Sequence, residues 1–181
     1  PLLNLLVRDR ARCRRLSRRL VQLSFRFHVE LMRVLGVLTY ELQGVERLRK
    51  PGQLVLANHP TLIDVVFLVS LMPNADCIVR SGLARNPFTR GPILACGYIC
   101  NDDGGALVDD CIAALREGST LLLFPEGTRT RRDAPMRLQR GAAHIAVRGR
   151  VGVTPVRLRC APLTLGKGDK WYRVPPQRFH Y

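Results

Sequence analysis

The sequence has few of the features that mark several common protein classes. Aromatic residues make up only 6% of its 181 residues, and no C-x-x-C pair occurs among its six cysteines. The first scarcity disfavours nucleic-acid binding and the second a zinc site. The G-x-S-x-G elbow of hydrolases that form a covalent acyl-enzyme is also absent. No internal repeat or low-complexity tract divides the chain, so the sequence predicts one globular unit with its own core.

Apolar runs long enough to span a membrane are missing as well. The most apolar long window, Leu54 to Met72, contains Asn58, His59, Pro60 and Asp64, and polar residues in its middle argue against a membrane span. Arginines crowd the N-terminal segment, where a secretory signal peptide needs a continuous apolar region. The sequence therefore predicts neither a membrane span nor a signal peptide.

Acidic residues are scarce: 14 stand against 29 lysines and arginines, which gives a net charge of +15 and a sequence pI near 10.9. A surface of this charge attracts phosphates, whether in nucleic acid, anionic lipid or a phosphorylated small molecule. Charge is the one feature that supports a nucleic-acid-binding domain, which we keep as a minor alternative. Lysine is rare among the basic residues. The codon usage of a GC-rich genome explains this preference for arginine as well as a functional reason does.

The six cysteines are spread along the chain, and Cys77, Cys96 and Cys111 lie in apolar stretches. Unpaired cysteine in such a place behaves as a small buried hydrophobe. We therefore expect free thiols and a reducing, cytoplasmic compartment. With four histidines and no cysteine pair, no metal site is predicted.

From Arg14 to Leu38, apolar residues recur every three or four positions, which predicts an amphipathic helix with an arginine-rich face. The apolar positions are Leu16, Leu20, Leu23, Phe27, Leu31, Val34, Leu35 and Leu38. Two compatible placements fit: the helix packs on its own domain with a solvated basic face, or it lies among the headgroups of an anionic membrane. We assign residues 1–38 to a membrane-associating segment and residues 39–181 to the remaining domain.

After this helix, short apolar runs alternate with helical ones, and glycine or proline punctuates nearly every change. The alternation predicts an α/β fold with a mostly buried mixed sheet flanked by helices. Strands are expected near residues 39–43, 53–57, 77–79, 98–100, 120–124 and 151–158, and helices over residues 63–71, 106–117 and 139–148. Gly118 and Gly149 are expected to end the last two helices in the left-handed conformation. The C-terminal tail is expected to contribute at most an edge strand.

The segment N-H-P-T-L-I-D, residues 58–64, stands where a strand is expected to end and a helix to begin. A histidine followed by an aspartate five residues later is weak evidence by itself, because one such pair arises readily by chance. Five residues turn an ideal helix by about 500°, so the two side chains meet only if His59 precedes the helix and Asp64 lies inside it. Pro60 fits a first helical position, where its missing N–H costs nothing.

The segment F-P-E-G-T-R, residues 124–129, directly follows an expected buried strand. Open α/β sheets hold ligands just beyond the carboxyl ends of their strands. Gly127 permits a close backbone approach, and Arg129 offers a forked donor to a phosphate. The alternative is that Glu126 and Arg129 only pair across a turn.

Together these residues resemble the glycerolipid acyltransferases, the superfamily that includes 1-acylglycerol-3-phosphate acyltransferase. The resemblance spans about residues 39–158, in the order and spacing of the family's blocks. The family's N-H-x-x-x-x-D block matches Asn58, His59 and Asp64, and its F-P-E-G-T-R block matches in full. Residues 91–99 and 153–156 represent its second and fourth blocks.

The resemblance implies transfer of a fatty acyl group from acyl-CoA or acyl carrier protein to a hydroxyl of a lyso-lipid such as 1-acylglycerol-3-phosphate, without a further cofactor. It implies that His59 is the general base and that Asp64 fixes and stabilises its imidazole. The residues that it implies for substrate binding are Asn58, Gly97, Glu126, Gly127, Thr128, Arg129 and Pro155. It also implies a peripheral enzyme at the cytoplasmic face of a membrane.

One departure concerns the acceptor. Where the family often has an arginine for the acceptor phosphate, this chain reads G-Y-I-C-N-D-D from Gly97 to Asp103. Arg80, Arg85 and Arg90 are candidate substitutes, and an acceptor with another headgroup is an alternative. A lipid-binding relative with impaired catalysis is the remaining alternative.

Overall fold

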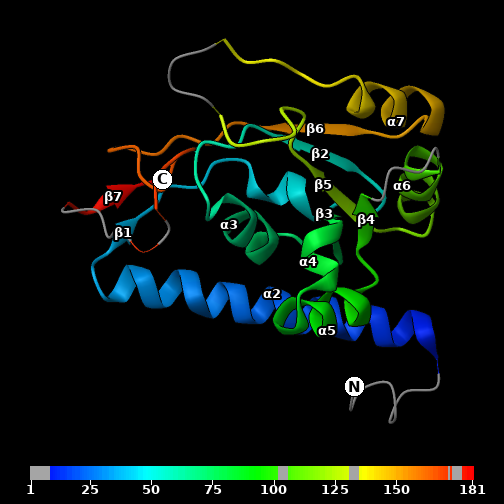
Figure 1. Ribbon diagram of the computed structural model, residues 1–181, viewed down its shortest axis with the longest axis horizontal. Coiled ribbons are helices and arrows are strands. Elements are labelled where there is room, and N and C mark those ends of the chain that lie inside the picture. The colour runs from blue at the N-terminus through cyan, green and yellow to red at the C-terminus, as the bar shows by residue number, and fades with distance from the viewer. Residues whose placement is uncertain (1–8, 102–105, 131–134, 171, 173–176) are drawn as a thin grey trace.

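A parallel five-stranded sheet forms the centre of the fold, in the order β4-β3-β5-β2-β6 (Figure 1). The computed structural model describes residues 9–101, 106–130, 135–170, 172 and 177–181. The strands are β2 (Leu54–Ala57), β3 (Ala75–Arg80), β4 (Ile99–Asn101), β5 (Thr120–Leu123) and β6 (Val153–Val156). The predicted α/β class is confirmed, but the described strand pairs of this sheet are all parallel, whereas the sequence predicts a mixed sheet.

Helices cover both faces of the sheet (Figure 1). They are α2 (Arg10–Val34), α3 (Asp64–Leu71), α4 (Ser81–Arg85), α5 (Pro87–Cys96), α6 (Leu107–Arg116), α7 (Gly141–Gly149) and the 3-10 helix η1 (Val45–Arg49). Val55 of β2 packs in the core that α3 covers, whereas its neighbour Leu54 packs in the core that α6 and α7 cover. Successive residues of a strand point to opposite sides, so this alternation buries both faces.

A second, smaller sheet joins the segment that follows α2 to the C-terminal segment. β1 (Leu38–Thr39) pairs in parallel with β7 (Phe179–His180). Leu38 and Phe179 are buried there in a third apolar cluster, which also contains Phe67 of α3. The edge strand expected in the C-terminal tail therefore exists, but it pairs outside the main sheet.

Residues 81–96 form α4 and α5, which the sequence does not predict. Their glycines and prolines favour a loop by composition, yet Pro87 stands in the first turn of α5, where a missing N–H costs no hydrogen bond. Asn86 caps this helix by accepting a hydrogen bond from the N–H of Phe88 at 2.9 Å. Proline here starts a helix instead of preventing one.

The helix ends differ from prediction in one place. Gly118 adopts the left-handed conformation after α6, as predicted, with φ of 85°. At the end of α7 the left-handed residue is Arg150, not Gly149. Gly149 lies against α6, where an added Cβ would stand 3.2 Å from the Ile112 side chain. Close helix packing, not backbone conformation, therefore explains this glycine.

None of the six cysteines forms a disulfide, and Cys77, Cys96 and Cys111 are buried, as predicted. Burial raises the pKa of Cys77 and of Cys111 to about 12. These thiols are therefore protonated at neutral pH and pack as small apolar groups.

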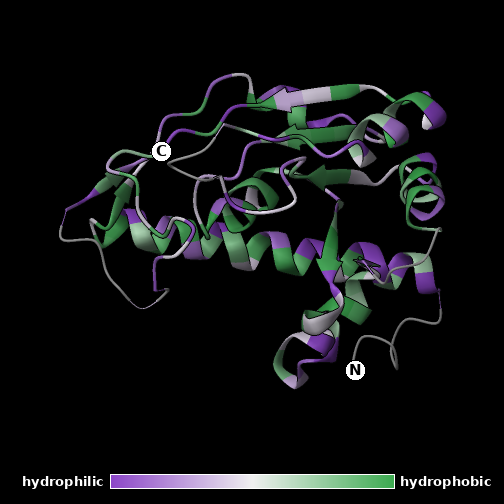
Figure 2. Cartoon of the chain, turned by 45° about the horizontal axis from the view of Figure 1, so that its top comes forward, coloured by the Kyte–Doolittle hydropathy of each residue, from purple (hydrophilic) through white to green (hydrophobic). Residues whose placement is uncertain are grey.

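α2 packs on the domain through a side that mixes polar residues with Val21, Phe25 and Met32, and its leucine stripe faces outward. Cys13, Ser17, Arg18, Gln22 and Val29 are its buried residues. The apolar positions that define the predicted stripe, Leu16, Leu20, Leu23, Phe27, Leu31 and Val34, are all exposed, Phe27 by 70% and Val34 by 74%. Figure 2 shows apolar and polar residues interleaved along this helix. The helix therefore packs on its own domain with Arg15, Arg19, Arg26 and Arg33 exposed, as the first placement predicts, but its leucine stripe is not the packed side.

The helix also ends earlier than predicted. Its last residue is Val34, and Gly36 turns the chain with φ of 74°. Leu38, expected to be the last apolar residue of the helix, is fully buried in β1 instead. No helix in the described part of the chain is long and apolar enough to cross a bilayer.

A buried arginine holds α2 in this orientation. Arg18 donates through Nη2 to Asp76 Oδ2 at 2.6 Å, through Nη1 to Ser119 Oγ at 2.7 Å, and through Nε to the Cys96 carbonyl at 2.8 Å. The side chains of Arg18 and Asp76 are 5% and 1% exposed. Burial raises the pKa of Asp76, and the guanidinium opposes that rise. The cluster joins α2 to the amino ends of β3 and β5.

Replacing Arg18 with alanine is expected to lower the free energy of unfolding by about 3–5 kcal/mol, because Asp76 stays buried without its partner. Urea denaturation followed by circular dichroism measures the loss. Arg15→Ala is the matched control, since Arg15 is exposed on the same helix, and it is expected to change stability by less than about 0.5 kcal/mol. Equal effects of the two substitutions would contradict the anchoring role.

Candidate active site

The two predicted motifs meet at one edge of the sheet. β2 and β5 are adjacent and parallel, and His59 and Glu126 each follow the carboxyl end of their strand. α3 begins at Asp64, so His59 stands in the loop before the helix, as the five-residue spacing requires. Pro60 lies in the same loop and is not the first helical residue, contrary to the prediction. Parallel topology thus assembles the site from segments far apart in sequence.

His59 and Asp64 are in direct contact. The distance between His59 Nδ1 and Asp64 Oδ2 is 2.8 Å, with Asp64 fully buried and the His59 side chain 16% exposed. The imidazole stacks on the Phe124 ring, with centroids 4.1 Å apart and an interplanar angle of 23°. A neutral imidazole that donates from Nδ1 presents an unprotonated Nε2. Within the described residues, no hydrogen bond engages that atom.

Four donors hold the Asp64 carboxylate. Oδ2 accepts from His59 and from the backbone N–H of Thr61 at 2.8 Å. Oδ1 accepts from the Thr61 hydroxyl at 2.6 Å and from the Tyr181 hydroxyl at 2.5 Å. The sequence does not predict these two hydroxyls. Thr61 stands inside the first motif, whereas Tyr181, 117 residues from Asp64, has no sequence signal.

Glu126 ties the two motif loops together. Its Oε1 accepts from the His59 backbone N–H at 3.1 Å and from the Thr130 hydroxyl at 2.7 Å. The Thr130 N–H in turn donates to the His59 carbonyl at 2.7 Å. Glu126 is only 8% exposed, and among the described ion pairs none joins it to Arg129. Its carboxylate positions the loop that carries His59.

The rest of the second motif forms a tight turn. Gly127 has φ of 66°, and its N–H donates to the Phe124 carbonyl at 2.9 Å. A side chain at this left-handed position is strained, which explains the glycine. Arg129 donates through Nη1 to the carbonyls of Leu165 and Gly166, at 2.9 and 2.8 Å. Its Nε and Nη2 have no hydrogen-bond partner among the described residues, and Thr128 beside it is half-buried.

Asn58 and Pro155 belong to the framework around the site. Asn58 Nδ2 donates to the Leu158 carbonyl at 2.9 Å, and the Leu158 N–H donates to Asn58 Oδ1 at 2.7 Å. These bonds link the chain beyond β2 to the chain beyond β6. Pro155 is exposed in β6, an edge strand, where a residue without an N–H is tolerated.

Gly97 does not join the other predicted site residues. It ends α5 in the left-handed conformation, with φ of 61°, at the amino edge of the sheet. An added Cβ would stand 2.6 Å from Arg14 Cδ, and the Gly97 carbonyl accepts from Arg18 Nη2 at 3.5 Å. Gly97 packs against α2, and its role in substrate binding stays a prediction.

Of the candidate substitutes for the missing arginine, Arg80 reaches the edge where the motifs lie. It is the last residue of β3 and is exposed. Arg85 donates to Ser81 Oγ at 3.2 Å within α4, and Arg90 lies in α5. Asp102 and Asp103, the acidic pair of the departure, lie outside the described residues.

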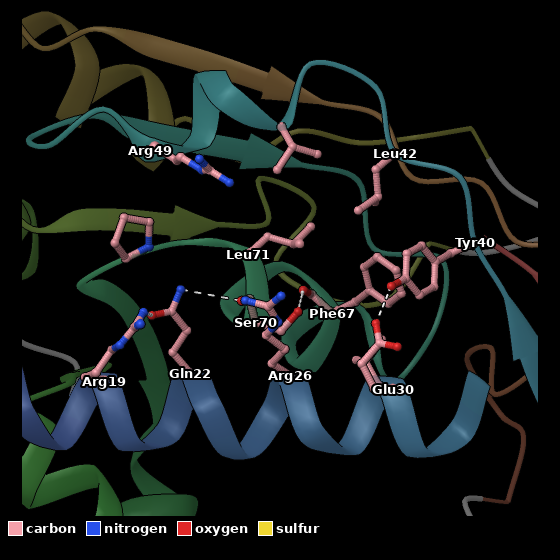
Figure 3. A pocket seen from close by; sticks show the side chains of 13 residues that line it. Arg19, Gln22, Arg26, Glu30, Tyr40, Leu42, Arg49, Phe67, Ser70 and Leu71 are labelled. Carbon is pink, nitrogen blue, oxygen red and sulfur yellow. Dashed lines mark hydrogen bonds between the residues drawn. The ribbon is translucent and has the colours of Figure 1, made fainter. Parts of the chain in front are cut away.

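Two cavities border α3. The larger, of about 520 Å³, lies between α2, α3 and η1, and Arg19, Arg26 and Arg49 point toward it (Figure 3). The smaller, of about 100 Å³, is lined by Val156, Leu158 and Tyr181 among others. Over the described ranges, no cluster of three or more histidine, cysteine or acidic side chains could hold a metal ion.

The site and fold are those of a known enzyme family. The family model described as Acyltransferase matches residues 39–159, so the chain belongs to the acyltransferase family. It is 26% identical over 145 residues to a 1-acyl-sn-glycerol-3-phosphate acyltransferase of Pseudomonas aeruginosa, covering 75% of this chain and 55% of that protein. A protein of the same name from Limnanthes douglasii is 27% identical over 147 residues, covering 75% and 50% of the two chains.

The fold also matches a solved structure. The 1-acyl-sn-glycerophosphate acyltransferase PlsC from Thermotoga maritima aligns with a TM-score of 0.74 and 23% sequence identity, over 97% of this chain and 70% of that chain. At this identity the match shows the shared fold. The chain spans about half the length of the curated relatives named above.

The loop-joining role of Glu126 predicts different effects for two substitutions. Because Oε1 accepts both hydrogen bonds, Glu126→Gln retains an acceptor there and is expected to lower the unfolding free energy by about 1 kcal/mol or less. Glu126→Ala removes both bonds from a buried position, for an expected loss of about 2–3 kcal/mol. Urea denaturation of both variants measures the difference. If glutamine is as damaging as alanine, the negative charge itself is required.

Proposed function

We propose that this protein transfers a fatty acyl group from an acyl thioester to a hydroxyl of a lyso-lipid, with His59 as the general base. The observation that carries the proposal is the 2.8 Å contact between His59 Nδ1 and Asp64 at the carboxyl edge of the sheet, beside the F-P-E-G-T-R turn. Membership of the acyltransferase family supports the reaction class.

The chemistry follows from the exposed side of the imidazole. His59 Nε2 removes the proton from the acceptor hydroxyl as that oxygen attacks the thioester carbonyl. Asp64 stabilises the imidazolium that results and keeps the ring oriented. Collapse of the tetrahedral intermediate breaks the C–S bond, and the departing thiolate takes the proton back from Nε2. The new ester and a free thiol are the products, and no covalent acyl-enzyme forms.

The acceptor in this proposal carries a phosphate, as 1-acylglycerol-3-phosphate does. Arg129 supports this choice because its Nε and Nη2 edge is free of described partners at the turn that follows β5. Arg80 is a second cation at the end of the neighbouring strand. The relatives' names specify the same acceptor class.

The donor is acyl-CoA or acyl carrier protein. Both donors are anionic, and the chain's net charge of +15 favours the approach of either. The free, buried thiols fit the cytoplasmic compartment in which these donors occur.

The first experiment measures free-thiol release from a panel of acyl-CoA and acyl carrier protein donors, with and without lyso-lipid acceptors. Acceptor-dependent release is expected from the parent protein. His59→Ala is expected to lower kcat/KM at least about a hundredfold, because a general base contributes roughly 10²–10⁴-fold. His144→Ala is the control, since His144 is exposed on α7.

Equal turnover by the parent and His59→Ala would exclude the proposed base. No turnover with any donor and acceptor would instead favour a lipid-binding relative with impaired catalysis.

We also propose that the protein associates with the cytoplasmic face of a membrane through α2. The exposed stripe on this helix, Leu16, Leu20, Leu23, Phe27, Leu31 and Val34, is its contact with lipid. Arg15, Arg19, Arg26 and Arg33 lie about 200–240° around an ideal helix from Cys13, between the buried side and the stripe. A helix with its apolar side in the acyl boundary and arginines at headgroup level is typical of interfacial binding.

The larger cavity gives an anionic headgroup a place beside that stripe. Arg26 and Arg49 reach it from α2 and η1 and have no described hydrogen-bond partner, while Arg19 donates to Gln22 at 2.6 Å (Figure 3). Their charge complements a lipid phosphate.

Flotation with lipid vesicles tests the membrane proposal. Replacing Leu20 and Phe27 together by serine is expected to lower the partition coefficient at least about tenfold, because each apolar side chain contributes about 1.5–3 kcal/mol when buried. Val147→Ser on α7 is the control, since Val147 is 76% exposed away from the stripe.

A second pair of variants tests the cavity. Arg26→Gln with Arg49→Gln is expected to weaken binding to vesicles that contain phosphatidylglycerol and to leave binding to pure phosphatidylcholine unchanged. If the variant with serine at Leu20 and Phe27 binds vesicles as the parent does, α2 is not the contact with lipid.

A further inference from the structure

A tyrosine remote from both motifs lies directly behind the His59–Asp64 pair. The Tyr181 hydroxyl donates to Asp64 Oδ1 at 2.5 Å, on the oxygen that does not face His59. It also contacts the Thr61 hydroxyl. Tyr181 is 9% exposed and Asp64 fully buried, so this contact lies out of water.

The small sheet fixes the backbone of Tyr181. Its N–H donates to the Thr39 carbonyl at 2.9 Å, and its carbonyl accepts from the Glu41 N–H at 2.9 Å. These bonds continue the parallel pairing of β1 with β7. The position of the phenol therefore depends on the segment that follows α2.

The ring of Tyr181 is held as firmly as its backbone. It stacks on Phe67 with centroids 5.0 Å apart and an interplanar angle of 11°, and it meets Phe179 edge-on at 6.0 Å. Phe67 lies in the first turn of α3, the helix that Asp64 begins. Stacking on that helix sets the phenol and the carboxylate in one fixed relation.

The phenol is a permanent donor. Burial, followed by the neighbouring Asp64 charge, raises the pKa of Tyr181 well above its usual value. The hydroxyl therefore keeps its proton at neutral pH. A neutral donor beside a buried carboxylate stabilises the ionised form of that carboxylate.

We infer that Tyr181 is a positioning residue of the catalytic pair, whose hydroxyl fixes Asp64 Oδ1 so that Oδ2 stays directed at His59 Nδ1. A carboxylate turns about its last bond with little resistance, so its orientation depends on what each oxygen binds. Tyr181 and Thr61 hold one oxygen, which leaves the other to orient the imidazole. The inference rests on the proposed role of His59 as the base.

The hydroxyl also sets how strongly Asp64 attracts a proton on His59. Each hydrogen bond to the carboxylate disperses part of its charge. The other charged group in contact with this loop is Glu126, which accepts from the His59 backbone. Cys160 lies near Tyr181, and burial raises the pKa of its thiol, which is neutral at pH 7. Removal of the phenol hydroxyl therefore acts on His59 through Asp64.

Tyr181→Phe tests the inference, because it keeps the ring stack on Phe67 and removes only the hydroxyl. We expect kcat to fall about tenfold with KM within about twofold, since orientation of the base acts on the chemical step. The acid limb of the pH–rate profile and the midpoint of the His59 ring titration, followed by NMR, are both expected to rise by roughly half a pH unit.

Tyr40→Phe is the matched control. Tyr40 also contacts Phe67, edge-on at 5.2 Å, and its hydroxyl donates to the Glu30 carboxylate, but neither contact reaches His59 or Asp64. This variant is expected to lose stability while keeping the parent kcat, acid limb and NMR midpoint. A generic effect of removing a tyrosine hydroxyl would appear in both variants.

A second substitution reverses the sign of the effect. Site-specific 3-fluorotyrosine at position 181 keeps the ring and makes the hydroxyl a stronger donor, so the NMR midpoint is expected to fall. This measurement remains informative if Tyr181→Phe folds poorly.

The outcomes separate this inference from the proposed function. If His59→Ala is inactive while Tyr181→Phe matches the parent in kcat and NMR midpoint, the positioning role is excluded and the base remains. If His59→Ala is fully active, the proposed base fails. The NMR midpoints then still decide whether Tyr181 controls the pair: a shift supports the inference, and no shift overturns it.

Discussion

A single buried arginine determines how this domain is arranged. A guanidinium removed from water requires both a counter-charge and further hydrogen-bond acceptors. Arg18 finds them at the amino edge of the sheet, in Asp76, Ser119 and the Cys96 carbonyl. α2 therefore covers that edge, and the loops of the opposite edge remain available for chemistry. The same requirement sets which side of α2 faces inward, and the leucine stripe therefore faces out.

Two buried carboxylates have different partners at the carboxyl edge of the sheet. Glu126 joins the two motif loops through the His59 backbone and Thr130, and Asp64 holds the imidazole. Hydrogen bonds engage both carboxylates. In the proposed reaction the chemistry falls to His59 Nε2, and arginines at the strand ends recognise the negative charge of the substrate. With these separate roles, a strongly basic protein holds two acidic side chains, Asp64 and Glu126, inside its site.

The sequence predicted the α/β class, most of the central strands and the His59–Asp64 contact, because these depend on local periodicity and on spacing along one loop. It failed where a partner is distant. No sequence signal near Arg18 indicates that Asp76 is its partner. The helix could therefore be predicted, but the side on which it packs could not. Tyr181 meets Asp64 across 117 residues, which no local pattern records. Gly97 matched a family block in sequence, and its close approach to Arg14 is a further contact with a distant residue that no local pattern records.

The contacts of Arg18 also bear on the order in which the protein is made. α2 is synthesised early, but its anchors at Cys96 and Ser119 follow 78 and 101 residues later. Chains grow from the N-terminus at about 5–20 residues per second, so the helix waits several seconds for the residues that bury its arginine. During that interval its leucines and Phe27 have no protein partner from the later domain. Under the proposed membrane contact, the stripe of α2 is available to a bilayer surface before the rest of the domain folds.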